Sequence, residues 1–328
     1  MKRFIINLIV LVLMLSFVGC STGNNAVTPT NPPDLEQGTP DTKPEQTAPP
    51  VDNSAAIKIE LKGTSIVAGD GVSVNGNVAT ITAAGTYEVT GKLNEGQLVV
   101  EADACEINLI FNNVDIHCSN SAPLFVKKAD HVYLSLADNS VNTLTDGNIY
   151  NLEPGITEPD ATLFSKADMT ISGNGSLNIK ANYNDGIANR DTLVIQSGTI
   201  NVDAVNHGIK GKDFLSVIGG DVKVIAGLDG IKSTQDTDAT LGYVNVSGGN
   251  LDIKAGDEAI SAVTNVKISG GTIKIDTANN AIKAGTFVDI SAGKVTILTE
   301  DKGLVCAEEK LSSNAEVTVN GSKLIANY

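Results

Sequence analysis

One short pattern returns at nearly constant spacing through the second half of the chain. Each copy has two mostly polar residues, then glycine or alanine, then isoleucine or leucine. The six copies are residues 184–187, 206–209, 228–231, 257–260, 279–282 and 301–304. Their third residues are 22, 22, 29, 22 and 22 positions apart, so one interval holds a seven-residue insertion. A repeat this regular excludes an ordinary layered domain and predicts a solenoid.

Short segments within each repeat alternate apolar and polar residues, as in Val222–Val224, Leu251–Ile253 and Ile273–Ile275. Strand-period alternation between glycine-rich corners indicates β-strands, and helical periodicity is absent after the first 20 residues. Strands of about four residues bury their apolar face only by stacking on the next repeat. We therefore predict an all-β, right-handed parallel β-helix with coils of about 22 residues. Its inward column would run from Ile187 to Leu304.

The N-terminus is typical of a secreted lipoprotein. Residues 1–20 combine a charged start with an apolar run and end in Phe17-Val-Gly-Cys20. This pattern predicts a cleaved signal, lipid on Cys20 and an extracellular protein anchored to the cell membrane, with a plain signal peptide as the alternative. Residues 21–55 hold seven of the ten prolines and are expected to form a disordered linker. Residues 56–328 form the β-helix domain.

The formal net charge of −15 argues against nucleic acid as a partner and favours cations. Cys105, Cys118 and Cys306 are too few for a disulfide framework, and the first two are either buried thiols or one bridge. We expect a monomer.

Carboxylates gather where neighbouring repeats would meet. Stacked coils bring Asp229 to about 5 Å from Glu258, with Asp257 adjacent. Three carboxylates this close favour a hard cation, and Ca²⁺ suits an all-oxygen ligand set. Two further calcium sets are predicted, one of Asp191, Asp213, Asp236 and Asp238, the other of Asp185 with Asn184 and Asn206. Amide ladders and Asx turns are the alternative for each of these side chains.

Several motifs are more specific than a generic β-helix. They include Ile107-Asn-Leu-Ile-Phe-Asn-Asn-Val-Asp-Ile116, Pro123-Leu-Phe-Val-Lys127, His207-Gly-Ile-Lys-Gly-Lys-Asp213 and the Asp-Gly-Ile repeats. Across about residues 60–328 the chain resembles the bacterial extracellular carbohydrate-binding domain-containing family of pectate-lyase-like right-handed β-helices. The resemblance implies that it binds calcium and plant cell-wall polysaccharides, both cellulose and acidic pectic chains such as polygalacturonate, without need of catalysis.

Sugar-binding candidates lie near the repeats. Tyr150 and Tyr183 are predicted to stack on sugar rings, beside Asn184, Arg190 and Lys210, whereas the phenylalanines of the domain are expected in the core. A calcium-dependent lyase is one alternative, because Arg190 near Asp185 could serve as the base facing a calcium-bridged uronate. A structural surface spacer or adhesin is the other. We interpret the chain as a non-catalytic, calcium-dependent polysaccharide-binding protein.

Overall fold

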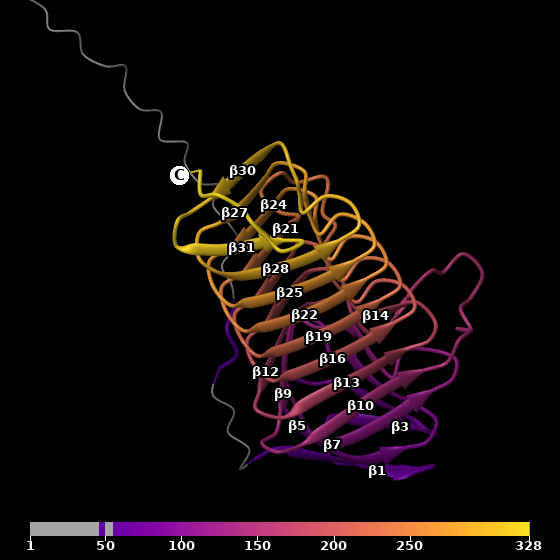
Figure 1. The fold of residues 1–328 in the computed structure, drawn as a ribbon. Coiled ribbons are helices and arrows are strands. Elements are labelled where there is room, and N and C mark those ends of the chain that lie inside the picture. The colour runs from indigo at the N-terminus through magenta and orange to yellow at the C-terminus, as the bar shows by residue number, and fades with distance from the viewer. Residues whose placement is uncertain (1–45, 50–54, 328) are drawn as a thin grey trace, which may run out of the picture. The chain divides into compact units, whose positions relative to one another are not determined.

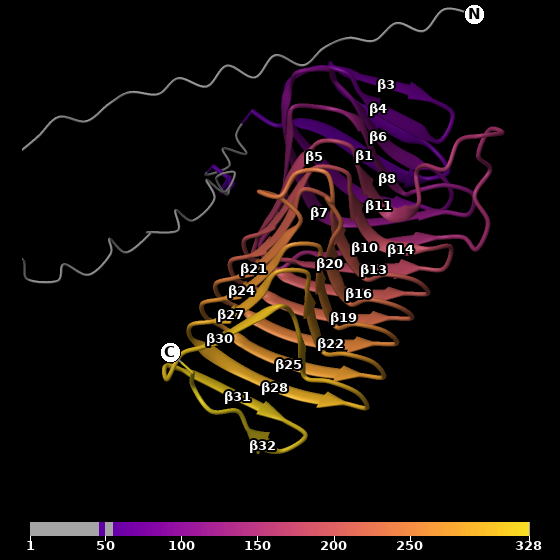
Figure 2. The same ribbon diagram turned by 90° about the horizontal axis from the view of Figure 1, so that it is seen from above.

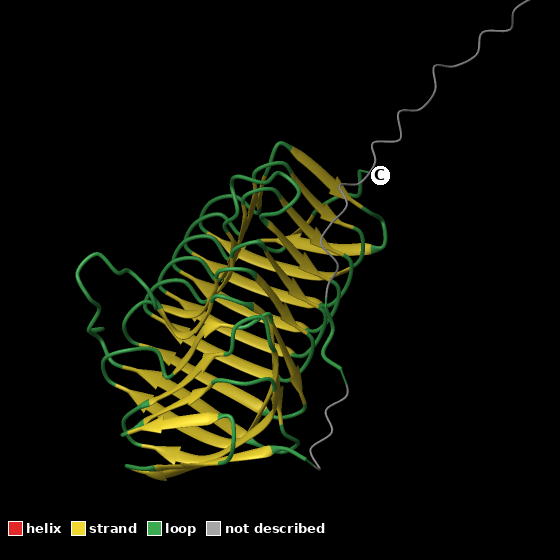
Figure 3. Ribbon diagram, turned by 180° about the vertical axis from the view of Figure 1, so that it is seen from behind, coloured by secondary structure: helices red, strands yellow, loops and turns green. Residues whose placement is uncertain are grey.

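The structure is a computed structural model that describes residues 46–49 and 55–327. The predicted signal, Cys20 and most of the predicted linker lie outside the described residues. Within the described part every regular element is a β-strand, so no helix there is long and apolar enough to cross a membrane (Figure 3). The predicted parallel β-helix is confirmed: successive coils stack along one axis, and strands one coil apart pair in parallel (Figures 1 and 2).

Each regular coil contributes three strands, one to each of three faces. Face A consists of β9 (His131–Leu136), β12 (Asp168–Gly173), β15 (Thr192–Ile195), β18 (Phe214–Val217), β21 (Tyr243–Val246), β24 (Asn265–Ile268), β27 (Phe287–Ile290) and β30 (Glu308–Leu311). Face B consists of β10 (Val141–Asp146), β13 (Ser176–Ala181), β16 (Thr199–Ala204), β19 (Asp221–Ala226), β22 (Asn250–Ala255), β25 (Thr272–Thr277), β28 (Gly293–Thr299) and β31 (Ala315–Val319).

Face C carries the repeat pattern from which the solenoid was predicted. It consists of β6 (Gln97–Glu101), β8 (Leu124–Lys128), β11 (Ala161–Ser165), β14 (Asp185–Asn189), β17 (Ile209–Gly211), β20 (Ile231–Ser233), β23 (Ile260–Ala262), β26 (Ile282–Ala284) and β29 (Leu304–Val305). In chain order a coil runs through faces C, A and B, and the B-to-C corner then leads into the next coil.

Irregular strands close the two ends. They are β1 (Ile57–Gly63), β2 (Ile66–Ala68), β3 (Val72–Asn75), β4 (Val78–Ile81), β5 (Gly85–Leu93), β7 (Glu106–Cys118) and β32 (Ser322–Lys323). The pairs β1–β2, β3–β4 and β31–β32 are antiparallel. The long β7 pairs with both β9 and β10 and so joins faces A and B. Antiparallel ends occupy part of the open edge that a solenoid otherwise presents.

The predicted aliphatic column holds the coils together. Ile187, Ile209, Ile231, Ile260 and Ile282 are consecutive Cα partners, each fully buried, and Leu304 continues the column. Burying one such side chain contributes about 1.5–3 kcal/mol, so the column stabilises every coil-to-coil contact in this half of the protein.

Candidate functional site on face C

Small residues set the geometry of the B-to-C corner. A Cβ added at Gly208 would lie 2.2 Å from Cγ1 of Val224 and 2.5 Å from the carbonyl oxygen of Gly230. Gly208 does not have a positive φ, so close packing, and not backbone conformation, requires glycine here. The amides of Gly186, Gly208 and Gly230 donate at 2.9 Å to the carbonyls of His207, Asp229 and Glu258. These bonds hold the polar residues of the corner in one column.

Three carboxylates meet on this column, as the sequence predicted. Asp229, Asp257 and Glu258 place one ligand oxygen each within 4.8 Å of the others, the one group of three or more acidic, histidine or cysteine side chains so arranged among the described residues. Asp229 and Glu258 are buried, and Asp257 is half-buried. The oxygen-only donor set and its spacing fit a hard divalent cation such as Ca²⁺.

Lysines on the outer side of face C lie beside this acidic group. Nζ of Lys232 is 2.5 Å from Oδ2 of Asp229, and Nζ of Lys283 is 2.8 Å from Oε1 of Glu258. The hydrogen bond to Glu258 raises the pKa of Lys283, against a smaller opposing effect of burial. Two lysines against three carboxylates leave one negative charge for a bound cation.

His207 separates two acidic positions of the column. The amide of Asp229 donates to Nδ1 of His207 at 3.2 Å, which requires a lone pair on that nitrogen. Burial, followed by the charge of Lys232, lowers the His207 pKa. We therefore treat the imidazole as neutral, and its 3.6 Å approach to the Asp229 carboxylate as a contact and not an ion pair.

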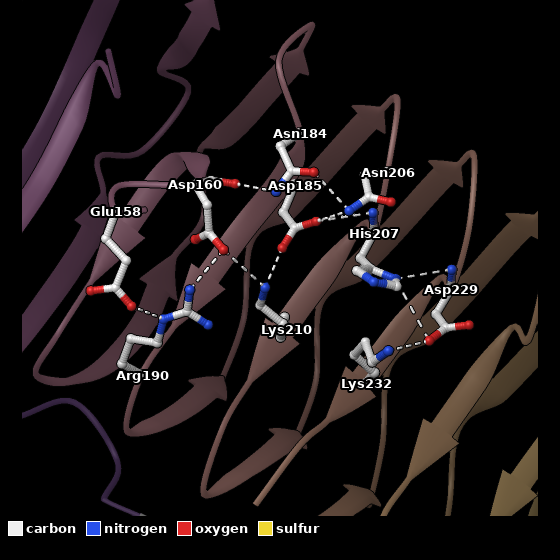
Figure 4. A network of polar contacts seen from close by, with 10 residues as sticks. All are labelled: Glu158, Asp160, Asn184, Asp185, Arg190, Asn206, His207, Lys210, Asp229 and Lys232. Carbon is white, nitrogen blue, oxygen red and sulfur yellow. Dashed lines mark hydrogen bonds and ion pairs between the residues drawn. The ribbon is translucent and has the colours of Figure 1, made fainter. Parts of the chain in front are cut away.

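A second charged cluster lies toward the N-terminal side of the same face (Figure 4). Arg190 donates from Nε to Oε1 of Glu158 at 2.6 Å and from Nη2 to Oδ2 of Asp160 at 2.7 Å. Lys210 donates to the fully buried Asp185 and lies 3.5 Å from Asp160. Arg190 therefore bonds the segment before β11, and Lys210 is the partner of Asp185. The pair of Arg190 and Asp185 considered for a lyase is not formed.

This pairing changes what Arg190 can do. Burial lowers the pKa of its guanidinium, but the charges of Asp160 and Glu158 outweigh burial, and the pKa is raised. A general base needs a lowered pKa, so a raised one disfavours proton abstraction by Arg190. The pKa of Glu158 is lowered: burial raises it, but the hydrogen bonds and charges of Lys166 and Arg190 outweigh burial.

The two tyrosines do not form an open sugar platform. Tyr150 is 7% exposed, and its hydroxyl donates to Oδ2 of Asp146 at 2.7 Å. Its ring stacks on Tyr183 with centroids 4.0 Å apart, so one face of Tyr183 is covered as well. Tyr150 is therefore a packing residue of the 147–160 loop, contrary to our prediction.

Two phenylalanines that we expected in the core, Phe125 and Phe164, lie on the outer side of face C. Phe125 and Phe164 are partners on β8 and β11, outside the main core, and contact edge-to-face at 5.6 Å. The 147–160 loop covers Phe164, whereas Phe125 is half-buried. The sequence could have placed Phe125 on the outer side, because side chains alternate along a strand and Leu124 belongs to the inward column.

The other predicted calcium sets are not assembled as ligand groups. Asp213 accepts from Gln235 at 3.1 Å, while Asp236 is exposed. Oδ1 of Asp238 accepts from the amide and hydroxyl of Thr240, and these bonds lower the Asp238 pKa. The 233–242 insertion lies at the C-to-A corner, where Asp191 also lies, next to β20 and away from the acidic group at the B-to-C corner.

Asn184 belongs to the amide ladder that the sequence offered as the alternative. Nδ2 of Asn206 donates to Oδ1 of Asn184 at 2.7 Å and to Oδ1 of Asp185 at 2.9 Å. Lys210 and this ladder together satisfy Asp185, which leaves it poorly placed to bind a metal.

Cys105 and Cys118 are both free thiols, and burial raises the pKa of Cys118.

Comparison with known proteins supports a role in carbohydrate recognition. A solved structure described as the polysaccharide lyase-like protein from C. thermocellum, gadolinium derivative, is similar with a TM-score of 0.68 and 33% identity. The similarity covers 79% of this chain and 98% of that one. The chain therefore has a polysaccharide lyase-like parallel β-helix fold.

The family is established by sequence. The family described as "Carbohydrate-binding domain-containing protein" matches residues 75–327, and the chain belongs to it. A curated relative of that description from Acetivibrio thermocellus is 39% identical over 137 residues, which are 41% of this chain and 48% of the relative. The match therefore spans about half of the relative's length.

Proposed function

We propose that this protein binds acidic plant cell-wall polysaccharide, polygalacturonate in particular, on face C without cleaving it, with Ca²⁺ assisting. The observation that carries the proposal is the meeting of Asp229, Asp257 and Glu258 within 4.8 Å beside an outward column of lysines. Carboxylates of a uronate chain can bond the lysines directly. A cation held by the three acids can accept the remaining uronate oxygens.

The arrangement of face C supports an extended ligand. Lys210 and Lys232 are Cα partners on adjacent coils, and Lys283 lies two coils beyond Lys232. Lys210 is buried against Asp185, and Ser261 lies between Lys232 and Lys283 in the column. Lys232 and Lys283 are therefore the lysines offered to a ligand, about 10 Å apart along the β-helix axis. Cellulose lacks carboxylates and would gain less from this surface.

Calcium would be held by Asp229, Asp257 and Glu258, and its chemistry there is charge neutralisation and bridging to ligand oxygens. On this chain Lys232 and Lys283 supply part of that neutralisation already. If Asp229 held Ca²⁺, Lys232 would lose its present partner and would be free to contact the ligand. We further propose that the protein acts at the cell surface, anchored through lipid on Cys20.

The deciding experiment is retention on insoluble pectin, cellulose and xylan, with and without a calcium chelator. We expect retention on pectin that chelation weakens. Failure on all three matrices would leave the surface spacer as the surviving function.

Lyase activity is the second candidate, favoured by the lyase-like description of the solved relative. It requires unsaturated uronate to accumulate with calcium and to be lost in Arg190→Ala. We expect no such product, because Arg190 is held by Glu158 and Asp160 with a raised pKa.

A further inference from the structure

The loop between β10 and β11, residues 147–160, projects from the side of the β-helix at the B-to-C corner (Figures 1 and 2), and its two ends pack against face C. Its first part is fastened by Tyr150, which packs with Phe164 and Ala188. Its end is fastened at Asp160, whose carbonyl accepts from Asn184 at 3.0 Å and from the amide of Asp185 at 3.2 Å. The tip between these anchors is exposed, with Ile156 55% exposed.

Glu158 has a different kind of attachment from either anchor. Its carboxylate forms ion pairs with Arg190 at 2.6 Å and with Lys166 at 2.8 Å. Lys166 and Arg190 follow the equivalent strands β11 and β14 on successive coils. The carboxylate is thus held by two cations in the way that a bound anion would be. The Glu158 side chain is 26% exposed, so it can turn outward without opening the core.

The charge balance of this cluster favours replacement of the Glu158 carboxylate by another anion. Lys166, Arg190 and Lys210 are matched by Glu158, Asp160 and Asp185, so the cluster is neutral with Glu158 in place. Displacing Glu158 alone leaves one uncompensated positive charge, in a chain whose net charge is −15. Asp160 and Asp185 cannot leave so easily, because Asp160 is also held through its backbone and Asp185 is fully buried.

We propose that Glu158 is an internal competitor for a carboxylate-binding subsite formed by Arg190 and Lys166, and that a uronate carboxylate of the ligand takes its place. This inference rests on the proposed function, whose polysaccharide it assumes. The subsite lies on the same face as the lysine column, so one chain can engage both. Exchange replaces one carboxylate by another, so the two cations never lose their counter-charge in the bound state.

The test measures the affinity of a galacturonic acid trimer at low ionic strength by calorimetry. Glu158→Gln removes the competing charge and is expected to bind roughly two- to fivefold tighter than the wild type. The matched control is Glu153→Gln, which removes one charge from the exposed part of the same loop and is expected to match the wild type. Adding Arg190→Gln to Glu158→Gln should abolish the gain.

Hydrogen exchange gives a second readout. Binding of the trimer to the wild type should speed exchange of residues 152–158, because their side-chain tie is released. If the wild type binds the trimer but Glu158→Gln and Glu153→Gln have equal affinities, the proposed displacement of Glu158 is wrong. Slower amide hydrogen exchange of the loop on binding would also contradict it. Failure of both the wild type and Glu158→Gln to bind overturns the proposed function itself.

Discussion

The backbone amide of Glu258 donates a hydrogen bond to Oδ1 of Asp229 at 3.2 Å, although 29 residues separate them. They are neighbours because one coil of the β-helix lies between them. The extra residues of that coil leave the helix between β20 and β21, at another corner, so the B-to-C corner keeps its regular spacing. The acidic group thus depends on coil stacking and not on the insertion that interrupts the repeat.

Removing one acid of this group should weaken calcium binding. We expect millimolar Ca²⁺ to raise the melting temperature of the wild type, since a ligand at 100 times its Kd stabilises the folded state by about 2.7 kcal/mol. Asp257→Asn should lose most of that increase. Asp252→Asn, on the exposed side of face B, is the matched control and should keep it. Equal shifts in the two variants would argue against calcium at this group.

The neutral state of His207 predicts a stability loss in mild acid. The pKa of His207 in the folded protein lies below its ordinary value of 6.5. Just below pH 6.5 the imidazole is therefore protonated in the unfolded chain but still neutral in the folded protein. Stability should therefore fall as the pH drops from 6.5 toward the folded pKa, and should not change through this group above 6.5. Urea unfolding at several pH values would show the slope, and His207→Asn should flatten it. An NMR titration with an unshifted imidazole would contradict the prediction.

Packing at the B-to-C corner should make Gly208 sensitive to a single methyl group. Gly208→Ala would force its Cβ against Val224 and the Gly230 carbonyl, and we expect it to destabilise the protein by about 1–3 kcal/mol. The reverse change at the equivalent Ala259, Ala259→Gly, should cost no more than about 1 kcal/mol. Chemical denaturation measures both. Similar small losses would mean that the coils adjust locally.

Tyr150 should matter for stability and not for sugar binding. Tyr150→Phe keeps the stack on Tyr183 but removes the hydroxyl that donates to the buried Asp146 carboxylate. Leaving that carboxylate one donor short should cost about 1–3 kcal/mol. Polygalacturonate affinity should stay at the wild-type level, because the ring is buried. A loss of affinity without a loss of stability would return Tyr150 to the binding surface.

Much of the fold followed from the sequence, because stacking of identical coils converts a spacing in the chain into a distance in space. The 22-residue repeat predicts that Ile187 lies over Ile209, and one repeat plus its seven-residue insertion predicts that Asp229 lies beside Glu258. Those predictions required only the coil height and the register of the repeat. The amide ladder of Asn184 and Asn206 was available as an alternative for the same reason.

The tertiary structure alone decided the partners of residues outside the repeat. The 147–160 loop has no counterpart in neighbouring coils, so its sequence gave no register from which to place Glu158 on Arg190 or Tyr150 on Tyr183. The repeat also does not determine which acid each lysine contacts. Lys210 bonds Asp185 on the preceding coil, whereas Lys232 bonds Asp229 on the same coil. Periodicity determines where a backbone lies, but charge pairing and packing determine which neighbour each side chain takes.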